Sequence, residues 1–110
     1  MNTKLLKELM QAPGVSGDEG KITEIFIREA KANGFAIEKD NLGSVYITKK
    51  SKTKNALKVL FDAHMDEVGF MVMGITETGL IEIDVKGGIW KHSLAYQRMS
   101  VWNYGADKSY

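Results

Sequence analysis

Apolar residues recur at helical spacing in the first part of the chain. Leu5, Leu6, Leu9 and Met10 fall on one face of a helix that would begin near residue 3. Pro13 ends it, because proline disfavours helical geometry in the preceding residue and lacks a backbone donor. The pattern therefore predicts a short amphipathic helix followed by a loop.

A second helix is predicted after this loop. Ser16 and Glu19 have the spacing of a capping box, in which each side chain accepts a hydrogen bond from the backbone at the helix start. Asn33 and Gly34 end the helix as a left-handed cap would. Its apolar stripe is Ile22, Ile25, Phe26 and Ala30.

The pattern then becomes that of strands. Residues 35–39 and 44–48 flank a turn at 40–43, which predicts a hairpin. Residues 57–63 form a nearly continuous apolar run, which predicts a strand buried on both faces in a sheet covered by helices. The lysine-rich stretch before it, residues 49–54, is interpreted as a solvated loop tip.

Beyond residue 67 the pattern indicates small β structure. Residues 68–74 and 80–85 predict a hairpin, and the second arm alternates apolar with acidic residues. Residues 97–103 predict another strand. The sequence thus predicts an α/β fold in two parts: residues 1–67 with helices and part of a sheet, and residues 68–110 with the beginning of a β-rich domain.

Composition narrows the function classes. Hydrophobic residues make up 44% and charged residues 26% of 110 residues, as in globular proteins. A net charge of +1 gives no electrostatic reason to expect nucleic acid or a membrane as partner. Cysteine is absent, which excludes thiolate metal sites, and no signal peptide or membrane span is evident. A cytoplasmic setting is expected.

The stretch DAHMDEVGF, residues 62–70, carries the candidate chemistry. His64 and Asp66 are two positions apart, so their side chains point the same way in extended backbone, and Asp66 could orient the imidazole for metal binding. Asp62 and Glu67 are further oxygen donors nearby. The alternative is a partly buried, hydrogen-bonded His64 with Asp66 capping the next turn. His92, Trp90 and Trp102 are interpreted as packing or surface residues.

Four stretches in order carry a family resemblance: LLKELMQAPGVSGDE, DNLGSVYITKK, VLFDAHMDEVGFMV and GGIW. The chain resembles the N-terminal part of the glutamyl aminopeptidase and endoglucanase-like metallopeptidases, which assemble into tetrahedral particles. The resemblance implies a catalytic α/β domain with a mixed sheet, into which a small β-rich domain that helps subunits to pair is inserted.

The same resemblance implies a site and a reaction. Two zinc or cobalt ions would activate a water that attacks the peptide bond of an N-terminal residue of a peptide substrate. By motif, His64 matches the first metal ligand, and Asp66 matches the catalytic-site acid that orients it. Homo-oligomers are implied as well.

The chain also departs from the family pattern. Family members are several times longer, and their other metal ligands and general base lie beyond residue 110, so the chain is expected to be a fragment that is inactive alone. Tyr96 stands where relatives often carry glycine. Two alternatives are a non-catalytic β-rich oligomerisation module and an endoglucanase. A glycosidase needs two opposed carboxylates, and the adjacent Asp66 and Glu67 give no support to that activity.

Overall fold

The computed structural model describes residues 3–103, 105 and 108–109. The chain divides into two compact units, Met1–Asp66 and Glu67–Tyr110, and each is described by itself. The assignment of these parts to a catalytic and an inserted domain stays a prediction.

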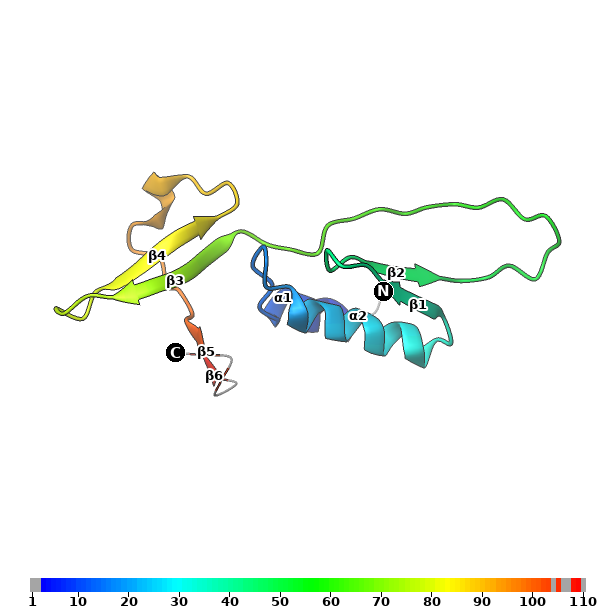
Figure 1. Cartoon of the computed structure of the whole chain (residues 1–110), viewed down its shortest axis with the longest axis horizontal. Helices are drawn as coiled ribbons and strands as arrows, with labels where there is room; N and C mark the ends of the chain where they lie inside the picture. Colours follow the sequence, from blue (N-terminus) through cyan, green and yellow to red (C-terminus); the bar gives the residue numbers. More distant parts are fainter. Residues whose placement is uncertain (1–2, 104, 106–107, 110) are drawn as a thin grey trace. The chain divides into compact units, whose positions relative to one another are not determined.

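Two helices open the first unit, as the sequence predicts. Helix α1 spans Thr3–Gln11 and ends before Pro13, and α2 spans Gly20–Ala32. In Figure 1, α2 lies along the hairpin of strands β1 and β2, with which it is in contact. The buried apolar side chains among the described residues all belong to α2; they are Ile22, Ile25 and Ala30.

The C-terminal end of α2 has the predicted left-handed cap. Gly34 has φ 69°, a conformation that glycine adopts without a side-chain clash. Its backbone N–H donates to Lys31 O (3.0 Å), and Phe35 N–H donates to Ala30 O (3.0 Å). These two bonds form a Schellman motif, which satisfies carbonyls at the helix end and directs the chain into the first strand.

The predicted capping box at the start of α2 is wrong. Glu19 itself occupies the N-cap position and makes no side-chain cap bond. Its Oε1 instead accepts a hydrogen bond from the backbone of Gly17 (2.6 Å), and Ser16 donates its hydroxyl to the carboxylate of Asp66. The helix thus begins three residues later than the capping box requires, and the Ser16 hydroxyl donates to an ionised acceptor, a strong kind of hydrogen bond.

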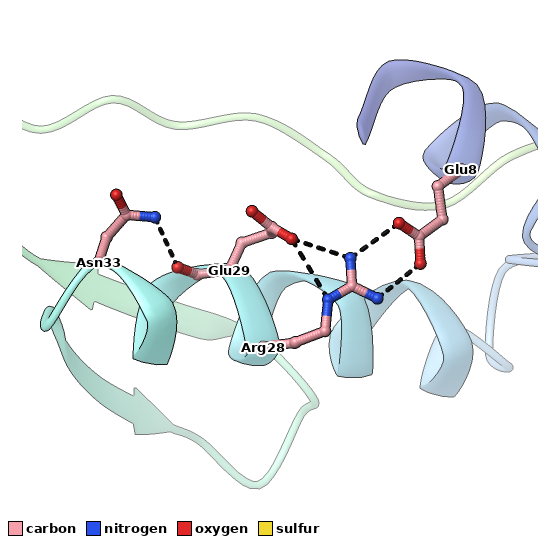
Figure 2. Close-up of polar contacts among 4 residues, drawn as sticks. All are labelled: Glu8, Arg28, Glu29 and Asn33. Atoms are coloured by element: carbon pink, nitrogen blue, oxygen red, sulfur yellow. Dashed lines mark hydrogen bonds and ion pairs between the residues drawn. The ribbon is translucent and has the colours of Figure 1, made fainter. Parts of the chain in front are cut away.

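An arginine connects the two helices. Figure 2 shows the Arg28 guanidinium between the Glu8 carboxylate, which it contacts at 2.6 and 2.8 Å, and the Glu29 carboxylate at 2.9 Å. The bond to Glu8 is a two-point fork, the strongest geometry for this pair. The side chains are about half exposed, so the pair orients α1 on α2 and contributes little stability.

The first predicted hairpin is confirmed. Strands β1 (Ala36–Lys39) and β2 (Val45–Thr48) are antiparallel, with Ile37 opposite Ile47. Asp40 closes the turn, because its Oδ1 accepts hydrogen bonds from the backbone of Leu42 (2.9 Å) and Ser44 (2.8 Å).

The predicted buried strand over residues 57–63 is wrong. In Figure 1 this segment runs as an extended trace, but within the described residues it belongs to no strand. Leu57, Leu60 and Phe61 are 89%, 83% and 92% exposed. The apolar pattern correctly indicates extended backbone, but a strand also needs a neighbour, and β2 pairs only with β1 in the described part of the chain. The mixed α and β character holds, whereas the described sheets are two-stranded and antiparallel rather than mixed.

The second unit contains the other predicted hairpin. Strands β3 (Gly69–Ile75) and β4 (Ile81–Lys86) are antiparallel, with an irregularity between Val72 and Gly74. A short 3-10 helix, η1, follows at Lys91–Leu94.

The strand predicted over residues 97–103 is found only at its end. Strand β5 spans Trp102–Asn103 and pairs with β6, Lys108–Ser109. No helix in the described ranges is long and apolar enough to span a bilayer.

Candidate metal-ligating site

The site predicted from the sequence lies at the end of the extended segment. His64 is exposed, and its Nδ1 lies 3.0 Å from Oδ1 and 3.0 Å from the backbone oxygen of Asp66. Asp66 therefore holds the imidazole, as its spacing from His64 predicts. The alternative of a partly buried His64 is wrong, because the side chain is 85% exposed.

These contacts define which nitrogen of His64 carries the proton. Both oxygens near Nδ1 can only accept hydrogen bonds once Asp66 is ionised, so Nδ1 must donate. In the neutral imidazole the lone pair then lies on Nε2. No hydrogen bond of Nε2 is recorded within the described part of the chain, so this nitrogen is available to a ligand.

The Asp66 carboxylate is shared between two partners. Its Oδ2 accepts a hydrogen bond from the Ser16 hydroxyl, and its Oδ1 accepts one from His64. The Ser16 hydroxyl and then the His64 imidazole lower the pKa of Asp66 below its ordinary value. The carboxylate thus stays an anion, which is the state that orients a metal-binding imidazole.

Met65, between the two site residues, anchors the segment to α2. Its sulfur lies 3.7 Å from the hydroxyl of Thr23, a buried residue of α2. A Cβ added at Gly14 would lie 2.7 Å from Cγ1 of Ile22 and 3.7 Å from Met65 O, so the loop before α2 approaches both closely. Because alternate side chains of an extended backbone point apart, anchoring Met65 directs His64 and Asp66 away from α2.

Three of these residues have no functional signal in the sequence. Ser16 fits a capping box equally well, and Thr23 and Met65 are ordinary members of a helix and an apolar run. Their partners lie 50 and 42 positions away along the chain, and only the fold brings them together.

The other candidate ligands are not gathered around His64. No group of three or more His, Cys, Asp or Glu side chains that could hold a metal ion occurs among the described residues. His92 lies in the second unit with its ring edge against Trp90, at 5.5 Å between ring centroids, which agrees with a packing role. The described residues thus provide one oriented imidazole rather than a complete site.

A cleft of about 550 Å³ adjoins the imidazole. It is lined by residues 42–49, which include β2, and by residues 59–66. His64 and Asp66 therefore lie on the wall of a concave surface of the first unit, where a ligand can reach Nε2.

A comparison with known protein families gives a match that covers most of the second half of the chain and includes the candidate metal-ligating site. The M42 glutamyl aminopeptidase family matches residues 43–108, a range that includes His64 and Asp66. This range is more than half of the chain, so the protein belongs to the M42 glutamyl aminopeptidase family. Peptidases of this family are metal-dependent in general.

Individual relatives agree with this assignment. The chain is 39% identical to the putative aminopeptidase FrvX of Escherichia coli over 92% of its length, and 37% identical to the glutamyl aminopeptidase of Lactococcus lactis over 76%. It is 32% identical to the lysyl aminopeptidase of Pyrococcus furiosus over 87%. These alignments cover 28%, 23% and 27% of the relatives, so the chain spans only about a quarter of their length. No solved structure matches it significantly.

Proposed function

We propose that this chain forms the N-terminal part of a metal-dependent aminopeptidase, in which His64 is a metal ligand and Asp66 is the acid that orients it. The observation that supports this most is the His64–Asp66 contact of 3.0 Å, which leaves the lone pair of Nε2 to bind a metal ion. A carboxylate bound to the second nitrogen of a metal-ligating histidine is the usual arrangement in zinc sites.

The described residues provide one of the ligands that a divalent-metal site needs. An imidazole nitrogen is a good ligand for zinc and cobalt, and a structural or catalytic zinc needs at least three protein ligands. In the proposed enzyme two such ions supply an activated water and stabilise charge on the substrate oxygen. Within this chain, Asp66 keeps the proton on Nδ1 and holds the ring, and Ser16 holds Asp66.

One ligand does not retain a catalytic ion, so the 110 residues alone are expected to be inactive. We propose a peptide substrate, cleaved at its N-terminal residue, because the relatives of this chain are named aminopeptidases. A homo-oligomer in the cytoplasm completes the proposal. The uncovered apolar surface of the chain supports the homo-oligomer.

The test compares the two histidines of the chain in the native polypeptide that carries this sequence. Hydrolysis of aminoacyl p-nitroanilides is measured with zinc or cobalt, for the unchanged protein and for His64→Ala and His92→Ala. We expect metal-dependent turnover that His64→Ala abolishes and His92→Ala retains. Turnover in His64→Ala equal to that of the unchanged protein would remove His64 as a ligand.

The same experiment tests the alternative of a non-catalytic oligomerisation module. That function requires an assembled native protein without hydrolysis of any aminoacyl anilide at any metal concentration. Release of sugar from β-glucans without peptidase activity would instead support the endoglucanase function.

A further inference from the structure

The Ser16 hydroxyl reaches the candidate site from a separate part of the chain. It donates to Oδ2 of Asp66, whose other oxygen, Oδ1, accepts from Nδ1 of His64. The three side chains form a continuous hydrogen-bonded series, and Asp66 is the link between a loop hydroxyl and the exposed imidazole.

The loop that carries Ser16 is fixed by its own hydrogen bonds. Asp18 N–H donates to Val15 O (2.8 Å), and Gly17 N–H donates to Glu19 Oε1 (2.6 Å). Gly17 has φ 90°, which a residue with a side chain rarely adopts. Glu19 Oε1 already accepts from the backbone of Gly17, and the Ser16 hydroxyl donates to Asp66 instead of to this nearby carboxylate.

The carboxylate needs this second partner in order to hold a fixed orientation. Asp66 is 37% exposed, so water competes for both of its oxygens. A hydrogen bond at Oδ1 alone allows the carboxylate to rotate about its terminal torsion, which is broad for aspartate. A donor at Oδ2 restricts that rotation and keeps Oδ1 in line with Nδ1.

We infer that Ser16 is a positioning residue of the candidate site: through Asp66 it fixes the tautomer and the direction of the His64 imidazole. Its hydroxyl acts through Asp66. The inference rests on the proposed function only for what Nε2 binds. The hydrogen-bonded series itself requires no metal and no activity.

The test measures the tautomer of His64 directly in the 110-residue chain. Long-range ¹H–¹⁵N spectra distinguish the Nδ1–H, the Nε2–H and the doubly protonated imidazole, so the ratio of the two neutral forms is read directly from them. Ser16→Ala is expected to lower the ratio of the Nδ1–H to the Nε2–H form roughly two- to fivefold, the lower part of the effect of one ordinary hydrogen bond, because the backbone oxygen of Asp66 still accepts from Nδ1.

Two further variants separate positioning from folding. Ser16→Thr keeps the hydroxyl and is expected to keep the ratio of the unchanged chain. Ser93→Ala, which removes a hydroxyl bonded to Trp90 O in the second unit, is the matched control and is expected to have no effect. Circular dichroism of all variants reports whether the helices are retained.

The outcomes are distinct. An unchanged ratio in Ser16→Ala, or an equal change in Ser16→Ala and Ser16→Thr, would overturn the inference. A lowered ratio that threonine restores supports it, even where the native polypeptide shows no peptidase activity and the proposed function fails. In a polypeptide that binds zinc, Ser16→Ala is also expected to weaken zinc affinity by up to about tenfold.

Discussion

The His64 imidazole and the Asp66 carboxylate, two residues apart, are joined at 3.0 Å by a hydrogen bond that leaves Nε2 without a recorded partner in the described chain. Asp66→Asn removes the negative charge and can present an amide N–H to Nδ1, which favours the opposite tautomer. We therefore expect metal affinity of the native polypeptide to fall about 10- to 100-fold.

Isothermal titration with zinc measures this change. Asp62→Asn is the matched control, because it removes one carboxylate from the same exposed segment at a residue that forms no hydrogen bond or ion pair with His64 in the described chain. Equal affinities for Asp66→Asn and the unchanged protein would contradict the orienting role of Asp66.

The close approach of Gly14 to Ile22 gives a second prediction. A Cβ at position 14 would lie 2.7 Å from Cγ1 of Ile22, which is 6% exposed and has little room to move. Gly14→Ala is therefore expected to destabilise the first unit by about 1–3 kcal/mol, the usual effect of overpacking. Urea unfolding followed by helical circular dichroism measures it.

Gly20→Ala is the control for this substitution. Gly20 is the first residue of α2, has no atom within 4 Å of an added Cβ and does not have a left-handed φ. Alanine at that position is expected to stabilise by about 0.4–1 kcal/mol, because it restricts the unfolded chain. A Gly14→Ala variant as stable as the unchanged protein would contradict the prediction, because it would show that the loop before α2 moves to accommodate the added methyl group.

Local patterns predicted much of this fold. The two helices, the left-handed cap at Gly34 and both hairpins follow from periodicity and turn residues, which act over a few positions. The His64–Asp66 contact is local as well. Ser16 was assigned to a capping box because a serine three residues before glutamate carries no information about an acceptor fifty positions away.

The strand predicted over residues 57–63 failed for the same physical reason. Its apolar run predicts extended backbone, and that is what the structure contains. Pairing depends on a second strand, however, and the run itself does not specify where such a strand comes from. Local sequence thus determined conformation here, while long-range partners determined pairing and burial.

The Glu8–Arg28 fork predicts a pH dependence. The Arg28 hydrogen bonds lower the pKa of Glu8 below its ordinary value, so the folded state binds a proton here less readily than the unfolded state. The stabilisation is therefore present above the ordinary glutamate pKa of about 4.3 and is lost as pH falls through the lowered value. Docking of α1 on α2 should weaken over that acidic range.

Amide hydrogen exchange of α1, compared between the unchanged chain and Glu8→Gln, isolates this effect from other carboxylates. Glu24→Gln is the matched control, since Glu24 lies on α2 and forms no ion pair in the described chain. The difference between the unchanged chain and Glu8→Gln should vanish at low pH. A difference that is constant with pH would contradict the prediction.

Tyr96 has φ 63°, a left-handed conformation that is unfavourable for a residue with a Cβ. It is fully exposed, so its ring contributes little packing. Tyr96→Gly is expected to stabilise the second unit by up to about 1 kcal/mol, the strain relieved less the entropy of glycine.

Ala95→Gly is the comparison variant, and its expected change in stability has the opposite sign. Ala95 has φ −60°, so glycine there gives no relief and is expected to destabilise by about 0.5–1 kcal/mol. Thermal unfolding followed by the fluorescence of Trp90 and Trp102, both in the second unit, measures both variants. A destabilising Tyr96→Gly would show that strain at this position is offset elsewhere.

The exposed segment over residues 57–61 predicts self-association of the 110-residue chain. Leu60 and Phe61 are 83% and 92% exposed, and no backbone hydrogen bond of this segment is recorded within the described residues. Strand β2 also has an edge that pairs with no described strand. An extended apolar segment and an open edge are templates for pairing with another copy, and a charge in the segment opposes it.

Sedimentation velocity should therefore show concentration-dependent species that the double variant Leu60→Lys/Phe61→Lys reduces. Leu42→Lys is the control, because Leu42 is equally exposed but isolated in the β1–β2 turn. Association that survives the double variant but not Leu42→Lys would assign it to the turn instead.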